Sequence, residues 1–290
     1  MNDMRKILLM GFFMFLMSAT VILCDEYTEK RREMVETQIQ SRGITDSATI
    51  EAMMSVPRHL FVPEDLQSEA YADYPLPIGH GQTISQPYVV ALMTSLLHLK
   101  GDEKALEVGT GSGYQAAVLA TIVQEVYTVE IIPELAERAD TTLKECGYGN
   151  VTVRNADGYF GWEEHQPYDV IMITAAVDHI PPPLLQQLAD GGRLVLPLGN
   201  PLYYQTLTVV EKRGNEFITT HSTSVRFVPL TGYAGEIEST AVAPDSQAPQ
   251  EKKTQSPPWV SPGIRGGIIL IVLIIILGIA WKSKGSQKKF

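Results

Sequence analysis

Cysteine is scarce in this chain of 290 residues, which contains only Cys24 and Cys146. Two cysteines cannot form the disulfide framework of a small secreted domain, so that class of protein is excluded. The six histidines lack the spacing of metal ligands, so no metal centre is expected. Charged residues make up only 19% of the chain and hydrophobic residues 44%, which excludes a wholly disordered protein.

Basic residues are scarce between the two ends of the chain. Residues 1–24 and 263–290 hold seven of the 23 lysines and arginines but only one of the 33 acidic residues. The remainder therefore has 16 basic and 32 acidic residues and a formal net charge of −16. Such a body repels phosphate backbones, so nucleic acid is not an expected substrate or partner.

The N-terminal end is strongly apolar. Residues 7–23 follow two basic residues and contain only one glycine, one serine and one threonine among apolar side chains. This pattern is typical of a signal peptide or an N-terminal membrane anchor at residues 1–24. Cys24 follows as in a lipoprotein signal, but Leu23 stands where a small residue is needed, so lipidation is not favoured.

The C-terminal end contains a second apolar run. Residues 266–281 read GGIILIVLIIILGIAW and carry no charge. A membrane-spanning helix needs roughly 20 residues. The run reaches that length when Ile264 is included and the charge of Arg265 extends to the lipid headgroups. We therefore predict a transmembrane helix over residues 263–281, which attaches the protein to a membrane.

The segments beside this helix have distinct compositions. Residues 282–290 are predicted to form a basic cytoplasmic tail, because positive charge favours that side of a membrane. Residues 235–262 are rich in Pro, Ser, Ala, Gln and Thr and are predicted to be a flexible linker. If both apolar segments span the membrane, the preference of positive charge for the cytoplasmic side places the body at residues 25–234 outside the cytoplasm. The basic residues 30–32 weaken that orientation. The side of the membrane is therefore left undecided.

The body alternates between apolar strands and helical patterns. This alternation predicts an α/β, doubly wound, mostly parallel sheet covered on both faces. Asp46 is expected to cap a helix, and Gly191 and Gly192 to end one. A ligand site is expected at the carboxyl ends of the strands. Strands are expected at 105–108, 126–130, 151–155, 169–174, 193–198, 206–210 and 217–227, and helices at 28–55, 88–99, 114–123, 133–146 and 183–188.

A glycine-rich loop, GTGSG, follows the first strand of this alternation. Its third glycine, Gly113, comes one position too early for the dinucleotide fingerprint, and bulky Tyr114 stands in the usual place, which argues against a nicotinamide cofactor. Glu130 ends the second strand, where a carboxylate can accept hydrogen bonds from ribose hydroxyls. Asp157 and Gly158 end the third strand, where a side chain can face adenine. An adenosine ligand without pyrophosphate, such as S-adenosylmethionine, fits these loops.

Further motifs accompany the glycine loop along the body of the chain. They are VPRHLFVP, AYADYPLPIGHGQTISQP, ALEVGTGSGYQAAVLA, NADG, YDVIMITAA, GGRLVLPLG and VRFVPL. Together these motifs are more specific than the glycine loop alone, and they resemble the bacterial type of the protein-L-isoaspartate O-methyltransferases over roughly residues 29–233. The resemblance implies a Rossmann-like class I S-adenosylmethionine-dependent methyltransferase fold, and both apolar ends lie outside it.

The resemblance also implies roles for particular residues. Ser85 would be the active-site hydroxyl. Where most relatives read GDG, this chain has Ala156 before Asp157, which leaves the acid in place. The cofactor-binding residues would be Glu107, Gly109, Gly111, Gly113, Glu130, Asp157 and Gly158. The residues holding the substrate would be Thr83, Ile84, Ser85, Val225, Phe227, Val228 and Pro229.

The implied reaction is methyl transfer from S-adenosylmethionine to the free α-carboxylate of L-isoaspartyl residues in damaged proteins. A carboxylate is already ionised at pH 7, so no strong base and no metal are needed. Catalysis then consists of positioning and desolvation, and the ester product cyclises to a succinimide. Three other hypotheses remain: a nicotinamide-dependent oxidoreductase, a membrane-tethered isoaspartyl-binding module without activity, and a methyltransferase for another carboxylate.

Overall fold

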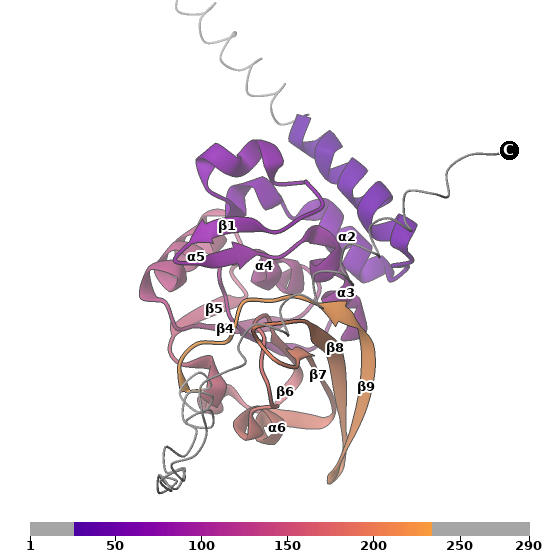
Figure 1. Ribbon diagram of the computed structural model, residues 1–290, viewed down its shortest axis with the longest axis vertical. Helices are drawn as coiled ribbons and strands as arrows, with labels where there is room; N and C mark the ends of the chain where they lie inside the picture. Colours follow the sequence, from indigo (N-terminus) through magenta and orange to yellow (C-terminus); the bar gives the residue numbers. More distant parts are fainter. Residues whose placement is uncertain (1–25, 234–290) are drawn as a thin grey trace, which may run out of the picture. The chain divides into compact units, whose positions relative to one another are not determined.

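The computed structural model describes residues 26–233 (Figure 1). The segments predicted at 1–24, 235–262, 263–281 and 282–290 lie outside the described residues. Within residues 26–233, no helix is both long and apolar enough to cross a membrane.

A seven-stranded sheet with the order β5-β4-β3-β6-β7-β8-β9 forms the centre of the fold. The first five strands in this order are parallel, and β8 and β9 are antiparallel additions at one edge. The chain moves outward from β3 to β5 and then crosses to β6 on the other side of β3, which makes the β3–β6 junction the topological switch point. The strands are β3 (Lys104–Val108), β4 (Glu125–Glu130), β5 (Val151–Asn155), β6 (Tyr168–Ile173), β7 (Leu188–Leu198), β8 (Gln205–Arg213) and β9 (Glu216–Val225).

Both faces of the central strands are buried, as their continuous apolar residues predict, whereas the edge strand β9 is exposed along most of its length. On β6, Val170 and Met172 pack into one hydrophobic cluster, and the alternating Ile171 and Ile173 pack into the other. This division follows from the two-residue period of a strand. The predicted doubly wound α/β fold with a mostly parallel sheet is therefore confirmed.

The helices cover the two faces unequally (Figure 1). Most buried apolar side chains of α2 (Ser47–Ser55) to α5 belong to the first cluster, whereas Leu184 of α6 belongs to the second. Pro87, Pro133 and Pro182 each stand in the first turn of their helix, where the missing N–H costs no hydrogen bond. The α-helices after the N-terminal region are α3 (Pro87–Leu96), α4 (Tyr114–Ala120), α5 (Pro133–Glu145) and α6 (Pro182–Gln187).

The helical pattern predicted over residues 28–55, with a cap at Asp46, corresponds to more than one helical segment. Residues 26–34 are helical, and a π turn η1 (Val35–Ile39) and a 3-10 turn η2 (Gln40–Arg42) end at Gly43, whose φ is +90°. The α2 helix (Ser47–Ser55) then starts anew, and the carboxylate of Asp46 accepts a hydrogen bond from the Thr49 N–H at 2.9 Å. The predicted cap is confirmed, and the glycine explains the break.

The Pro- and Gly-rich stretch between α2 and α3 contains more regular structure than a loop. Two 3-10 turns, η3 (Arg58–Phe61) and η4 (Glu64–Glu69), precede a two-stranded hairpin. Its strands are β1 (Leu76–Gly79) and β2 (Gln82–Ile84), and they pair antiparallel. This hairpin presents the predicted Thr83, Ile84 and Ser85 to the site.

Gly191 and Gly192 do not end a helix, so that prediction is wrong. The α6 helix stops at Gln187 and both glycines lie within β7. A Cβ on Gly192 would lie 2.8 Å from the carbonyl oxygen of Asp169 on β6, at a shift in the β6–β7 register. The glycine therefore allows close approach of two strands.

The last described residues return to the middle of the sheet. The strand β9 ends at Val225, two residues before the predicted end. Residues 226–233, named here the closing segment, leave its tip and cross the edge of the sheet (orange in Figure 1). Pro229 forms a bridge with Ala176 just beyond β6.

Candidate active site

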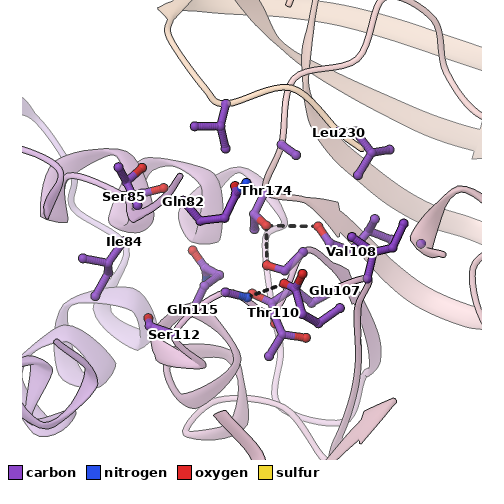
Figure 2. Close-up of a pocket in the computed structure, with 18 of the residues that line it drawn as sticks. Gln82, Ile84, Ser85, Glu107, Val108, Thr110, Ser112, Gln115, Thr174 and Leu230 are labelled. Carbon is purple, nitrogen blue, oxygen red and sulfur yellow. Dashed lines mark hydrogen bonds between the residues drawn. The ribbon is translucent and has the colours of Figure 1, made fainter. Parts of the chain in front are cut away.

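A cavity of about 850 Å³, counting its open mouth, lies at the carboxyl ends of β3, β4 and β6. It is at the topological switch point, where the sequence places a ligand. Figure 2 shows Ser85 and Gln82 on one side of the cavity and Glu107 and Thr110 across from them. The predicted site residues that line the cavity are Thr83, Ile84, Ser85, Glu107, Gly109, Gly111, Glu130, Gly158, Val228 and Pro229.

Gly113 does not line this cavity. It has a φ of +86° and precedes α4, and a Cβ there would lie 3.2 Å from Cδ1 of Leu143 on α5. Glycine at this position therefore serves the turn and the packing of α4 against α5.

Asp157 also lies outside the cavity lining. Its carboxylate accepts the N–H of Tyr159 at 2.9 Å and the N–H of Tyr233 at 2.7 Å. A Cβ on Gly232 would lie 2.5 Å from its Oδ2 atom. The predicted adenine-facing acid thus anchors the closing segment in this structure.

Two of the predicted substrate residues, Val225 and Phe227, do not line the cavity. Val225 is buried in the hydrophobic core, and Phe227 packs against that core. The Phe227 N–H donates to Oε1 of the buried Gln205 at 2.9 Å. These contacts fix the path of the closing segment, which brings Val228 and Pro229 to the cavity.

The glycine loop exposes its backbone to the cavity. A Cβ on Gly109 would lie 2.5 Å from Oγ1 of Thr174, so no side chain fits there. The Thr174 hydroxyl lies 2.6 Å from the carbonyl oxygen of Gly109 and ties the loop to the end of β6 (Figure 2). This arrangement permits a ligand to approach the main chain closely. Thr174 was not singled out from the sequence, because an isolated threonine after a strand carries no distinctive pattern.

Glu130 is held rigidly at the end of β4. Its Oε2 accepts the Gly111 N–H at 2.8 Å, and its Oε1 accepts the Ile132 N–H at 3.0 Å. A carboxylate oxygen can accept two hydrogen bonds, so each oxygen retains capacity for one more. This geometry suits a pair of ribose hydroxyls.

Glu107 is a buried acid on the cavity wall. Its Oε2 accepts the Thr128 hydroxyl at 2.6 Å, and its Oε1 has no hydrogen-bond partner in the described part of the chain. The pKa of Glu107 is raised to about 8, mainly because burial disfavours the charged form. The Thr128 hydrogen bond opposes this rise, and the nearby charge of Glu130 adds to it. An unpartnered buried acid on a cavity fits a ligand that supplies a cation or a donor.

Arg58 holds the main chain at Ser85, on the hairpin side of the cavity. This fully buried guanidinium donates to the carbonyl oxygen of Ser85 at 2.7 Å and to that of Ala70 at 2.7 Å, and it lies 4.8 Å from the ring centre of Tyr114. Burial lowers the pKa of Arg58 to about 10. Arg58 belongs to the motif VPRHLFVP, but its role was not predicted. A single arginine has no periodic pattern that would indicate a contact with a residue 27 positions away.

The hydroxyl of Ser85 makes no hydrogen bond within residues 26–233, although its main chain is fixed by Arg58. The side chain is therefore available to a ligand in the cavity. Among the described residues, no cluster of three or more His, Cys, Asp or Glu side chains can hold a metal ion.

Comparison with known proteins agrees with this geometry. The model of the family described as protein-L-isoaspartate(D-aspartate) O-methyltransferase matches residues 29–235. The chain is 56% identical to protein-L-isoaspartate O-methyltransferase 2 of Shewanella sediminis over 210 residues, which cover 72% of this chain and 86% of that protein. It is 55% identical to the protein-L-isoaspartate O-methyltransferase of Opitutus terrae over 204 residues, which cover 70% and 88%.

Solved structures show the same similarity. A protein-L-isoaspartate O-methyltransferase superposes with a TM-score of 0.66 at 28% identity, covering 72% of this chain and 68% of that one. A structure from Plasmodium falciparum, described under the same activity and holding S-adenosyl-L-homocysteine, superposes with a TM-score of 0.61 at 27% identity, covering 69% and 98%. On the family match and the close relatives, this chain belongs to the protein-L-isoaspartate(D-aspartate) O-methyltransferase family.

Proposed function

We propose that this chain methylates the free α-carboxylate of L-isoaspartyl residues in damaged proteins, using S-adenosylmethionine. The supporting observation is a single cavity that joins the Ser85 hairpin to the Glu107 and Glu130 side chains of the cofactor side. The family match and the relatives' names support the same reaction. The product ester would cyclise to a succinimide, which starts repair of the main chain.

The residues present fit the cofactor. Glu130 would accept the ribose hydroxyls, and Gly109 and Gly111 would let the main chain approach the ligand. Glu107 would face positive charge with its unpartnered oxygen. S-adenosylmethionine, when bound, supplies an electrophilic methyl group on a sulfonium centre.

The chain needs no strong base for this reaction. The substrate carboxylate is ionised at neutral pH, so its oxygen is already nucleophilic. Ser85 orients that oxygen through a hydrogen bond, and the apolar walls formed by Ile84 and Pro229 reduce its contact with water.

Transfer of labelled methyl groups tests the proposal. The full chain should label a peptide containing L-isoaspartate and leave the matched normal aspartyl peptide unlabelled. Binding of the isoaspartyl peptide without label transfer would identify a non-catalytic module. Thermal stabilisation by NADH but not by S-adenosylhomocysteine would identify an oxidoreductase.

We also propose that the apolar run at residues 266–281 attaches the enzyme to a membrane. The run's length and its lysine-rich flank support this, and both come from the sequence alone. Membrane fractionation of the full chain tests attachment. Alkaline phosphatase fused in the linker after about residue 240 reports on which side of the membrane the body lies. The side matters because S-adenosylmethionine is made in the cytoplasm. The charge rule, applied to two membrane spans, instead places the body outside the cytoplasm.

A further inference from the structure

Three large apolar side chains are exposed together in the turn between β7 and β8. Leu202, Tyr203 and Tyr204 are 75%, 69% and 72% exposed, more than any other large hydrophobic residue among the described ones. They belong to residues 200–204, named here the aromatic loop, which connects β7 to β8 and carries no charge. Contiguous exposed apolar side chains mark interaction surfaces more often than isolated ones.

The aromatic loop is an ordered turn. The Leu202 N–H donates to Oδ1 of Asn200 at 2.9 Å, and the Tyr203 N–H donates to the Asn200 carbonyl oxygen at 3.1 Å. The side chain of Gln205, which is 1% exposed, donates to the carbonyl oxygens of Asn200 and Tyr203 at 2.8 and 3.1 Å. The loop is therefore held in place while its apolar side chains face solvent.

The loop is continuous with the substrate side of the cavity. The same Gln205 accepts the Phe227 N–H, so one buried amide holds both the aromatic loop and the closing segment. Leu198, at the end of β7, bridges Val177, and the neighbouring Ala176 bridges Pro229 of the cavity lining. The aromatic loop thus follows β7, which is the neighbour of β6 in the sheet. Pro229, which the substrate is expected to contact, bridges Ala176 just beyond the end of β6.

On this basis, and resting on the proposed function, we infer that the aromatic loop binds apolar side chains that flank the isoaspartyl residue in the substrate chain. The free α-carboxylate of an isoaspartyl residue branches directly from the main chain, so it enters a cavity at the carboxyl ends of the strands most readily where the client protein is locally unfolded. Unfolding exposes the Leu, Val and Phe side chains that folded proteins bury. The loop therefore favours unfolded apolar segments over polar ones.

Matched peptides test this inference with the full chain. Two isoaspartyl peptides of equal length and charge are compared, one with leucine and phenylalanine around the damaged residue and one with serine. The wild-type kcat/KM should be about tenfold higher for the apolar peptide. The triple variant Leu202→Ser, Tyr203→Ser and Tyr204→Ser should reduce this ratio to about twofold or less, with unchanged activity on the serine peptide.

A control variant separates this effect from a general loss of surface hydrophobicity. Phe217 and Ile218 are also exposed apolar residues, but they lie at the other end of β9, opposite Lys212 and Glu211. Phe217→Ser with Ile218→Ser should keep the wild-type ratio. Binding of S-adenosylhomocysteine and the melting temperature check that each variant is folded.

Several outcomes would overturn the inference. Equal wild-type activity on both peptides would do so without any variant, as would an unchanged ratio in the triple variant. If the wild type labels neither peptide, the proposed function itself fails, and that result is distinct from labelling without preference.

Discussion

At the scale of single residues, the site combines polar side chains that already have main-chain hydrogen-bond partners with a few polar atoms that have none in the described part of the chain. Both oxygens of Glu130 already accept main-chain N–H groups, whereas Glu107 has one oxygen without a partner and Ser85 has a hydroxyl without one within residues 26–233. Unsatisfied polar groups on a cavity wall are the ones a ligand completes. Substitution of these two residues should therefore affect binding and catalysis most directly.

Ser85→Ala should lower kcat/KM for an isoaspartyl peptide by roughly ten- to a hundredfold, because a hydrogen bond to a charged group is lost. The dissociation constant of S-adenosylhomocysteine should stay within about twofold, since Ser85 lies on the hairpin across the cavity from the glycine loop. Methyl-transfer kinetics and calorimetry measure the two quantities. Activity within about twofold of wild type would remove the positioning role.

Glu107→Gln should change how stability depends on pH. The glutamate has an ordinary pKa of 4.5 when unfolded and about 8 when folded. Between these pH values the folded chain retains a proton that the unfolded chain has released, so stability falls as pH rises through this window. Glutamine cannot ionise, so the variant should melt roughly 10 °C above wild type at pH 9 and close to wild type at pH 4. A difference that is the same at both pH values contradicts this account.

At the scale of elements, the strands of the central sheet were predictable, whereas the β1–β2 hairpin and the contacts between distant elements were not. The strand predicted at 169–174 corresponds to β6 (Tyr168–Ile173). Its residues 170–173 are all apolar, because a strand that is buried on both faces needs apolar side chains on both. Gly192 resembles a helix terminator in sequence, yet its role is set by the Asp169 carbonyl on a neighbouring strand. The contact between Asp157 and the Tyr233 N–H joins residues 76 positions apart, which no local pattern encodes.

The contact between η3 and the hairpin leads to a prediction at this scale. Arg58→Lys keeps the charge but cannot reach both the Ser85 and Ala70 carbonyls, because lysine has no planar fork. We expect KM for the isoaspartyl peptide to rise about tenfold while the affinity for S-adenosylhomocysteine changes little. Arg154→Lys is the matched control, since Arg154 is more exposed and pairs with Glu164. Equal losses for peptide and cofactor would instead indicate a general structural role.

At the scale of the whole molecule, the central sheet separates two hydrophobic clusters. This division explains why the fold class could be predicted from the apolar runs in the sequence. Residues on a central strand such as β6 alternate between two separate hydrophobic clusters, so the central strands are largely apolar. The site was readable only in part, because the closing segment reaches the cavity through Gln205 and Ala176, which lie on different strands or loops.

The acidic body predicts a dependence on substrate charge. Residues between the two apolar ends carry a formal net charge of −16. An isoaspartyl peptide with added distant lysines should have a kcat/KM roughly three- to tenfold above its glutamate counterpart at low salt, and this ratio should approach one at about 0.5 M salt. Initial rates over a salt series measure it. A ratio that is independent of salt would show that long-range charge does not act on substrate capture.

The position of the closing segment in the chain has a consequence for biosynthesis. Val228 to Leu230 complete the cavity, yet the ribosome makes them after every strand of the sheet. A nascent chain that ends within β9 contains Ser85 and the glycine loop but lacks one wall of the pocket. Because domains fold as units during synthesis from the N-terminus, the enzyme acquires its complete binding site only in the final stage of translation of the folded body.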